Sequence, residues 1–213
     1  MKKLFILLTV LAVPTTFAAA PPNSSKGIIN KPSISKPSVS IDEYVTRIVD
    51  EASKLLSDSQ ISESQKISQS RKLMANNLDL EWMAEHSLGR HKKNLSSAQI
   101  SQFGKIYSDY VIKTYSNLIS NYKGQKTIVK RVIQLVQGKE YLVKTEVIQN
   151  GQPVKVDYLV RYVSQEKTNE IVPKISDIIT EDISILHSQQ QEFSSVINSK
   201  GFDTLITELK QKS

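Results

Sequence analysis

Apolar residues at helical spacing mark the start of the ordered part of the chain. Between residues 41 and 56 they recur every three or four positions, and Ser40 with Glu43 makes a capping box directly before them. A second capping box, Ser62 with Gln65, opens a more polar segment. The pattern therefore predicts one helix over residues 41–56 and another that begins after Ser62.

A long amphipathic helix is the clearest element that the pattern predicts. Ser96 and Gln99 cap it and Gly124 ends it, while residues 79 to about 88 predict a shorter helix before it, closed by Gly89. The apolar stripe of the long helix predicts packing against a sheet, with the lining of a cavity as the functional alternative. The stripe consists of Ile100, Phe103, Tyr107, Tyr110, Val111, Thr114, Leu118 and Tyr122.

After Gly124 the hydrophobic period changes from 3.6 to 2, which predicts strands. The strands cover residues 127–136, 141–148, 154–163 and 171–180. Asn150-Gly151, between the second and third strands, is a strong hairpin signal. Pro173 indicates that the fourth strand lies at an edge or contains a bulge.

The third predicted strand has an apolar face, made by its alternate valines and tyrosines from Val154 to Tyr162, and a wetter face. Two helices close the chain, around residues 189–197 and 202–210. Helices, then a meander of strands, then helices is the order of an α+β domain. We therefore expect helices packed on one face of a curved antiparallel sheet, an NTF2-like cone that can be hollow or filled.

The amino-terminal segment has the layout of a signal peptide. Lys2 and Lys3 precede an apolar run over residues 4–13, and small residues follow, with cleavage expected after Ala18. The apolar run is about half of the roughly 20 residues that a membrane span needs. Residues 19–39 are rich in Pro, Ser, Lys and Asn, which predicts a flexible leader before a single domain over residues 40–213.

Composition narrows the function classes. The chain of 213 residues has no cysteine, so a disulfide framework, a thiol nucleophile and lipidation at cysteine are all excluded. Its formal net charge of +7 becomes +5 without Lys2 and Lys3, and the excess is spread along the sequence. This weakens a nucleic-acid role and is compatible with mild attraction to anionic lipid surfaces.

No pattern assigns a catalytic or metal-binding residue. No two of the three histidines, His86, His91 and His187, have the spacing of metal ligands on one helix, and neither a nucleophile elbow nor a Gly-rich phosphate loop is present. Carboxylates in or beside the sheet could supply the general base of a hollow-cone enzyme. They are Glu146, Asp157, Asp177, Glu181 and Asp182, of which Asp157 is predicted on the wetter face.

Three segments carry a resemblance to a known family. They are DLEWMAEHSLGR at Asp79–Arg90, the Val-Asp-Tyr of the third strand, and KISDIITEDISILHSQQQEF at Lys174–Phe193 followed by Gly201-Phe202-Asp203. In this order the chain resembles the MlaC, or toluene-tolerance, family from about Ile41 onward. Departures from the family pattern are Pro173 for Trp, Ser176 for Tyr and Asp182 for Gly.

The resemblance implies a periplasmic shuttle that is not an enzyme. Family members carry phospholipid between an outer-membrane lipoprotein–porin complex and an inner-membrane ABC transporter complex, with the lipid as cargo and no cofactor. Alternation and resemblance together predict the residues that surround the acyl tails. They are Trp82, Met83, Leu88, Tyr107, Val111, Val143, Val147, Val156, Tyr158, Val160, Ile175, Ile183 and Ile185.

Two other functions remain open at this level. One is a periplasmic adaptor whose apolar sheet face is ordinary core and whose partner is a protein. The other is the hollow-cone enzyme. Lipid that co-purifies with the protein would distinguish a carrier from the adaptor, and turnover of a small-molecule substrate would reveal the enzyme.

Overall fold

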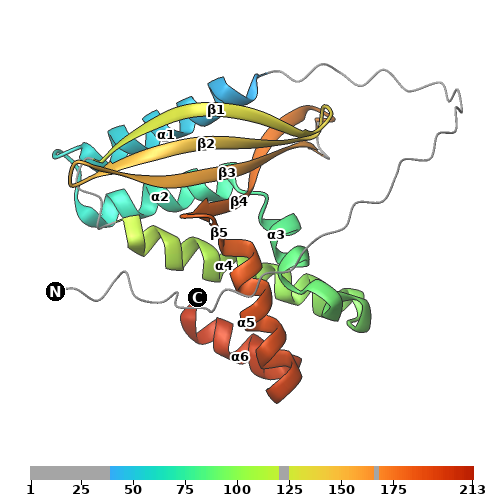
Figure 1. Cartoon of the computed structure of the whole chain (residues 1–213). Helices are drawn as coiled ribbons and strands as arrows, with labels where there is room; N and C mark the ends of the chain where they lie inside the picture. Colours follow the sequence, from blue (N-terminus) through green and yellow to red (C-terminus); the bar gives the residue numbers. More distant parts are fainter. Residues whose placement is uncertain (1–38, 120–124, 166–167) are drawn as a thin grey trace, which may run out of the picture. The chain divides into compact units, whose positions relative to one another are not determined.

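A curved antiparallel sheet and six α-helices make up the part of the chain that the computed structural model describes, residues 39–119, 125–165 and 168–213 (Figure 1). The expected signal peptide and all but the last residue of the leader lie outside these residues. The expected α+β class is confirmed. The elements are α1 (Ile41–Ser57), α2 (Glu63–Asn77), α3 (Leu80–Ser87), the 3-10 helix η1 (Gly89–Asn94), α4 (Ser97–Ile119), β1 (Lys126–Val136), β2 (Glu140–Gln149), β3 (Gln152–Ser164), β4 (Ile171–Thr180), β5 (Ile183–Ser184), α5 (Ile185–Lys200) and α6 (Phe202–Lys212).

The five strands form an antiparallel meander in the order β1-β2-β3-β4-β5. Register fixes which side chains share a face, because directly paired residues point the same way. One row across four strands is Val132, Val143, Tyr158 and Ile178. A second row is Tyr141, Val160 and Ile175. These rows define the inner face of the sheet.

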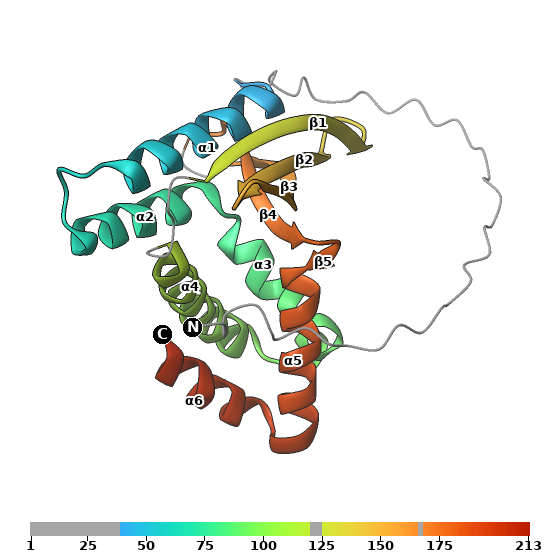
Figure 2. The same ribbon diagram turned by 60° about the vertical axis from the view of Figure 1, so that its left-hand side comes forward.

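Helix α1 packs on the inner face of β1 and β2 (Figure 2). Its first turns are buried at Ile41, Tyr44 and Val45, and the Tyr44 hydroxyl donates a hydrogen bond of 3.1 Å to the carbonyl oxygen of Asn77. Its later apolar residues, from Ile48 to Leu56, are only half-buried. The helix is therefore held firmly at its amino-terminal end and loosely at the other.

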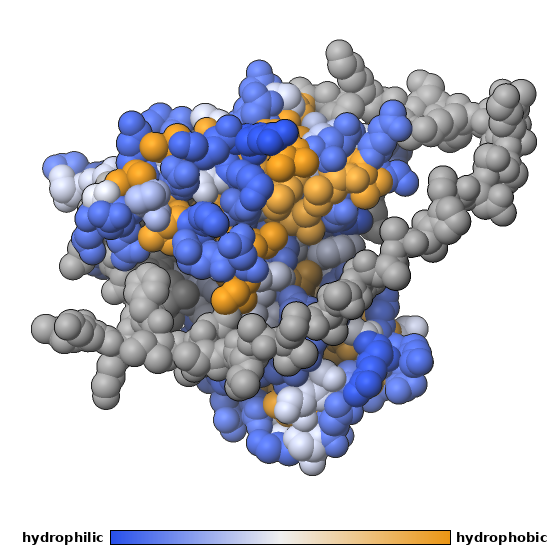
Figure 3. Space-filling view, viewed as in Figure 1, coloured by the Kyte–Doolittle hydropathy of each residue, from blue (hydrophilic) through white to orange (hydrophobic). Residues whose placement is uncertain are grey.

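Among the described residues, no helix covers the opposite, outer face of β1 and β2. There the apolar row Ile133, Leu142 and Leu159 lies between rows of charged residues, and all three side chains are half-buried. Figure 3 shows apolar side chains interspersed with hydrophilic ones over these strands. This matches the wetter face that alternation predicts for the third strand.

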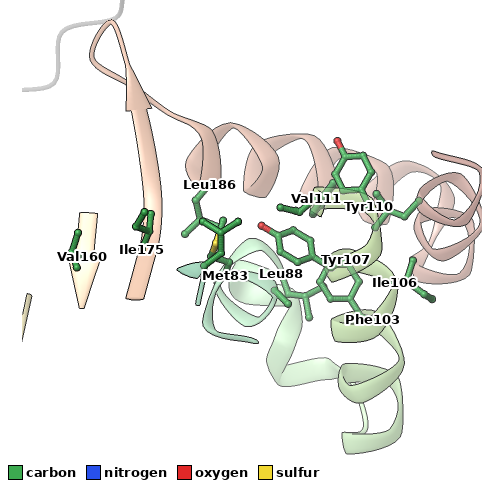
Figure 4. Close-up of a cluster of buried hydrophobic side chains, with 14 of the residues drawn as sticks. Met83, Leu88, Phe103, Ile106, Tyr107, Tyr110, Val111, Val160, Ile175 and Leu186 are labelled. Carbon is green, nitrogen blue, oxygen red and sulfur yellow. The ribbon is translucent and has the colours of Figure 1, made fainter. Parts of the chain in front are cut away.

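The hydrophobic core extends past β4 into a helix cluster formed by α3, α4, α5 and α6. Phe103 and Tyr107 of α4 pack their rings against Phe193 of α5, with ring centroids 6.0 and 6.2 Å apart. Figure 4 shows Val160 and Ile175 at the sheet end of this helix cluster and Phe103 and Ile106 at its other end. The apolar stripe of α4 predicted that this helix packs against the sheet, and that prediction is wrong. Helix α4 contacts α2, α3 and α6, because α3 and α5 occupy the place beside β4.

Helix α5 begins four residues earlier than the sequence predicts. Ser184 caps it by accepting a hydrogen bond of 2.9 Å from the backbone N–H of His187. Asp177 accepts the backbone N–H of Leu186 at 3.0 Å and the hydroxyl of Ser184. These bonds satisfy donors at the helix start, so the chain turns directly from β5 into the helix.

The turn between β4 and β5 contains two non-glycine residues in the left-handed region. Glu181 has φ 49° and Asp182 has φ 65°. This conformation is unfavourable for residues with a Cβ atom, although Asp tolerates it better than most. The turn thus holds two acidic residues in a conformation that glycine adopts more readily.

Relief of this strain is measurable by substitution at Asp182. Asp182→Gly and Asp182→Ala both remove the exposed contact with Lys155, at 3.4 Å, but only glycine relaxes the backbone. We expect the glycine variant to exceed the alanine variant in free energy of unfolding by about 1 kcal/mol. Denaturant unfolding checks this, and equal stability of the two variants would contradict a strained turn.

Candidate functional site: the apolar pocket under helix α1

An apolar pocket lies between α1 and the inner face of the sheet. Its volume is about 100 Å³. One wall is the half-buried side of α1, and the other comes from β1, β3 and β4. The lining residues are Val45, Ile48, Val49, Ala52, Ser53, Leu56, Thr127, Tyr158 and Ile175.

The gap follows from the residues that meet there. Ala52 and Ser53 give α1 two short side chains, and Thr127 is a small residue on β1. None of the lining residues is charged. The pocket therefore suits hydrocarbon, since a buried charged group needs a partner of opposite charge that this lining does not provide.

The pocket as it stands is small. Apolar cavities of about 150 Å³ accept a benzene molecule. A space of about 100 Å³ therefore holds only a few methylene groups. Two complete acyl chains would fit only if α1 and the sheet moved apart.

Burial raises the pKa of Tyr158 to about 12. The cause is loss of water around the phenol, which disfavours its charged form. The group is therefore neutral and protonated at neutral pH, and its hydroxyl can donate a hydrogen bond.

Twelve of the thirteen residues predicted to surround the tails lie in the pocket lining, on the rest of the inner face, in the helix cluster or at the junction of β5 and α5. Tyr158 and Ile175 line the pocket, while Val143, Val147, Val156 and Val160 belong to the inner face without appearing in its lining. Met83, Leu88, Tyr107 and Val111 are buried in the helix cluster. Ile183 and Ile185 lie at the junction of β5 and α5, where Ile183 is 38% exposed.

Trp82 lies on the outer-face side of β3 and forms a stack. Its ring is 3.5 Å from the His86 ring, centroid to centroid, and the Arg161 guanidinium lies 4.5 Å from the Trp82 centroid. Arg161 also pairs with Asp79 at 3.2 Å. These contacts join α3 to the sheet, and they hold Trp82 outside the pocket lining.

The α1 side of the pocket was missed by sequence reasoning. Five aliphatic residues of α1 line it: Val45, Ile48, Val49, Ala52 and Leu56. The available signal was the apolar stripe of this helix, which is as regular as that of α4 but carries smaller side chains. Small residues on one helix face are a reason to expect a gap opposite them.

The buried carboxylates do not face the pocket. Asp157 lies on the outer face, the wetter face that alternation predicts, yet it is only 7% exposed, because Lys144 pairs with it at 3.1 Å and the backbone N–H of Thr145 donates to it at 3.3 Å. Asp177 holds the start of α5. Both groups have structural partners, and neither lies in the pocket lining.

Across ranges 39–119, 125–165 and 168–213, no cluster of three or more His, Asp or Glu is placed to hold a metal ion. Over the same ranges, no helix has the length and apolar character needed to cross a bilayer.

Comparison with known proteins finds a matching family, related sequences and similar structures. The sequence model of a family described as MlaC protein matches residues 45–211. A Haemophilus influenzae protein, the intermembrane phospholipid transport system binding protein MlaC, is 26% identical over 170 residues, which cover 76% of this chain and 78% of that protein. A phospholipid-binding protein from Ralstonia solanacearum, solved in complex with a phospholipid, superimposes with a TM-score of 0.65 at 20% identity, over 79% of this chain and 93% of that one.

Because α1 is packed tightly at one end and loosely at the other, we expect truncation of the smaller side chain Val45 to destabilise the protein more than truncation of the larger Leu56. Val45→Ala removes two carbons at a site that is 1% exposed, and we expect it to cost about 2 kcal/mol of stability. Leu56→Ala removes three carbons beside an existing gap, and we expect a cost of about 1 kcal/mol or less. Denaturant unfolding of the lipid-free protein measures both, and a larger loss for Leu56→Ala would refute loose packing at that end.

Proposed function

The chain belongs to the MlaC protein family, and from this premise we propose that it is a periplasmic carrier that takes up a phospholipid molecule between α1 and the inner face of the sheet. It would shuttle the lipid between an outer-membrane lipoprotein–porin complex and an inner-membrane ABC transporter complex. The observation that carries the proposal is the apolar pocket, which has no charged residue in its lining. Support also comes from two relatives, one named for phospholipid transport and one solved with a phospholipid.

A carrier of this kind solves a solvation problem. Two acyl tails contain about 30 methylene groups, and at about 0.8 kcal/mol each their exposure to water costs on the order of 20 kcal/mol. An apolar sleeve removes most of that cost during transfer. The head group can stay in water, so the protein needs no charged site to hold it.

Loading requires the pocket to expand, and the packing of α1 indicates where. The buried first turns and the Tyr44 hydrogen bond keep one end of the helix in place. The half-buried stretch from Ile48 to Leu56 has fewer contacts to lose. We propose that this end of α1 separates from the inner face, and that the acyl tails then replace the contacts it gives up.

The role does not call for catalysis. Asp157 and Asp177, the buried carboxylates, already have cationic or backbone partners and lie outside the pocket lining. A carrier must also release its cargo unchanged. We therefore propose a binding protein and not an enzyme.

Filling the pocket with protein should block lipid loading. Ala52→Trp places a large ring where the tails would lie, and the half-buried site lets the helix remain folded. We expect the variant, purified gently from the periplasm, to carry at least tenfold less phospholipid per chain than the wild type. Lipid extraction with mass spectrometry provides the measurement.

A matched substitution controls for the added ring. Ala75 is exposed on α2 and does not line the pocket, so Ala75→Trp should keep the wild-type lipid content. If Ala52→Trp retains as much phospholipid as Ala75→Trp, the lipid is held elsewhere. If the wild-type protein carries none, the adaptor with a solid core becomes the better account.

A further inference from the structure

Strand β1 is a long free edge of the sheet. Among the described residues it pairs with β2 alone, so every second backbone N–H and C=O group along it points away from the sheet (Figure 1). The opposite edge is short or covered. There β5 has only two residues, Leu78 forms a bridge with Ile175 of β4, and the backbone N–H of Asp79 donates to the carbonyl oxygen of Ile175 at 2.8 Å.

The half of β1 from Arg131 to Val136 lies outside the pocket. Thr127, near the start of the strand, lines the pocket opposite α1, whereas no residue from Arg131 onward does. At the end of the strand, Leu135 and Val136 are 51% and 44% exposed, so two adjacent apolar side chains remain in water. Free backbone groups thus lie beside an apolar surface, a combination that suits the addition of a strand.

The charges along this edge have one sign. Strand β1 contains three cationic residues and no acidic one, and Lys139 lies in the turn that follows it. Lys130 pairs with Glu146 of β2 at 3.2 Å, but the side chains of Arg131 and Lys139 have no ion pair within the described part of the chain. A free cation therefore lies on each side of the apolar stretch at residues 132–136.

These cations decide which kind of strand the edge can accept. Lysine on an edge strand commonly prevents aggregation, and here it disfavours a second copy of this chain. Two β1 strands paired antiparallel about Arg131 would bring like charges together, which is destabilising. A strand with acidic residues is attracted by the same cations that repel a basic competitor.

We propose that the free edge of β1 from Arg131 to Val136 binds an extended segment of a partner protein by strand addition. The segment is apolar in its middle, where it covers Leu135 and Val136, and acidic at its ends, where it pairs with Arg131 and Lys139. Backbone hydrogen bonds supply the affinity, and the charges select the partner. This surface lies outside the lipid pocket, so the proposal does not depend on lipid carriage.

A short peptide serves as the probe. A blocked peptide of sequence Glu-Thr-Val-Thr-Val-Glu is titrated into the isotope-labelled mature chain, and NMR follows the backbone amides. We expect shifts centred on β1 and slower amide hydrogen exchange between Arg131 and Val136. A peptide with lysine in place of both glutamates should bind at least about tenfold more weakly, because attraction becomes repulsion at each end.

A third peptide separates strand addition from attraction between charges. It keeps the sequence of the first peptide but is N-methylated at alternate residues, so it has the same charges and cannot donate hydrogen bonds along one edge. We expect it to cause no shift in β1.

Two variants of the protein locate the site. Arg131→Glu should weaken binding of the first peptide about tenfold, because one ion pair is lost and one repulsion is added. Lys210→Glu makes the same kind of charge change at an exposed position of α6 and should leave the affinity unchanged.

The remaining outcomes would each overturn the proposal. Equal binding of the N-methylated peptide would mean that charge alone attracts it, and equal binding of the lysine peptide would remove the basis for an acidic partner. Absence of any response in β1 would leave the edge without a binding role. Shifts confined to the residues that line the pocket would mean that the peptide enters the pocket instead.

Discussion

The seam between α1 and the inner face of the sheet is the constraint on which the rest of the structure depends. In the proposed carrier, this seam must be apolar to hold acyl tails and weak enough to open for them. The packing of α1 differs between its two ends: Ile41 and Tyr44 are buried at one end, while Val49 and Leu56 border a gap at the other. A seam packed tightly along its whole length would leave no route for a lipid to enter.

The hydrophobic core extends from the inner face of the sheet into the helices. Rings from α4 and α5, together with the aliphatic residues Leu205 and Leu209 of α6, pack in the part of this core that lies outside the pocket lining. Asp177 joins this part to the sheet by holding the start of α5. In the proposed carrier, these buried contacts keep the protein folded while the loosely packed end of α1 opens for cargo.

The sequence was most informative where one local rule applies. Alternation placed each of the four long strands to within two residues, and Ser40, Ser62 and Ser96 marked helix starts, because both signals depend on near neighbours. The inner face was identified for the same reason. The helix that covers it was not, because periodicity shows that a helix has an apolar stripe but not what the stripe meets. The aromatic stripe of α4 drew attention to the helix cluster, whereas the smaller residues of α1 form the pocket.

The most direct test of this account is an experimental structure of the protein purified with its lipid. The account predicts acyl chains between α1 and the inner face, with the stretch from Ile48 to Leu56 displaced from the sheet and the helix cluster unchanged. Acyl chains lodged among Phe103, Tyr107 and Phe193, or a lipid-loaded protein whose α1 seam stays closed, would contradict it.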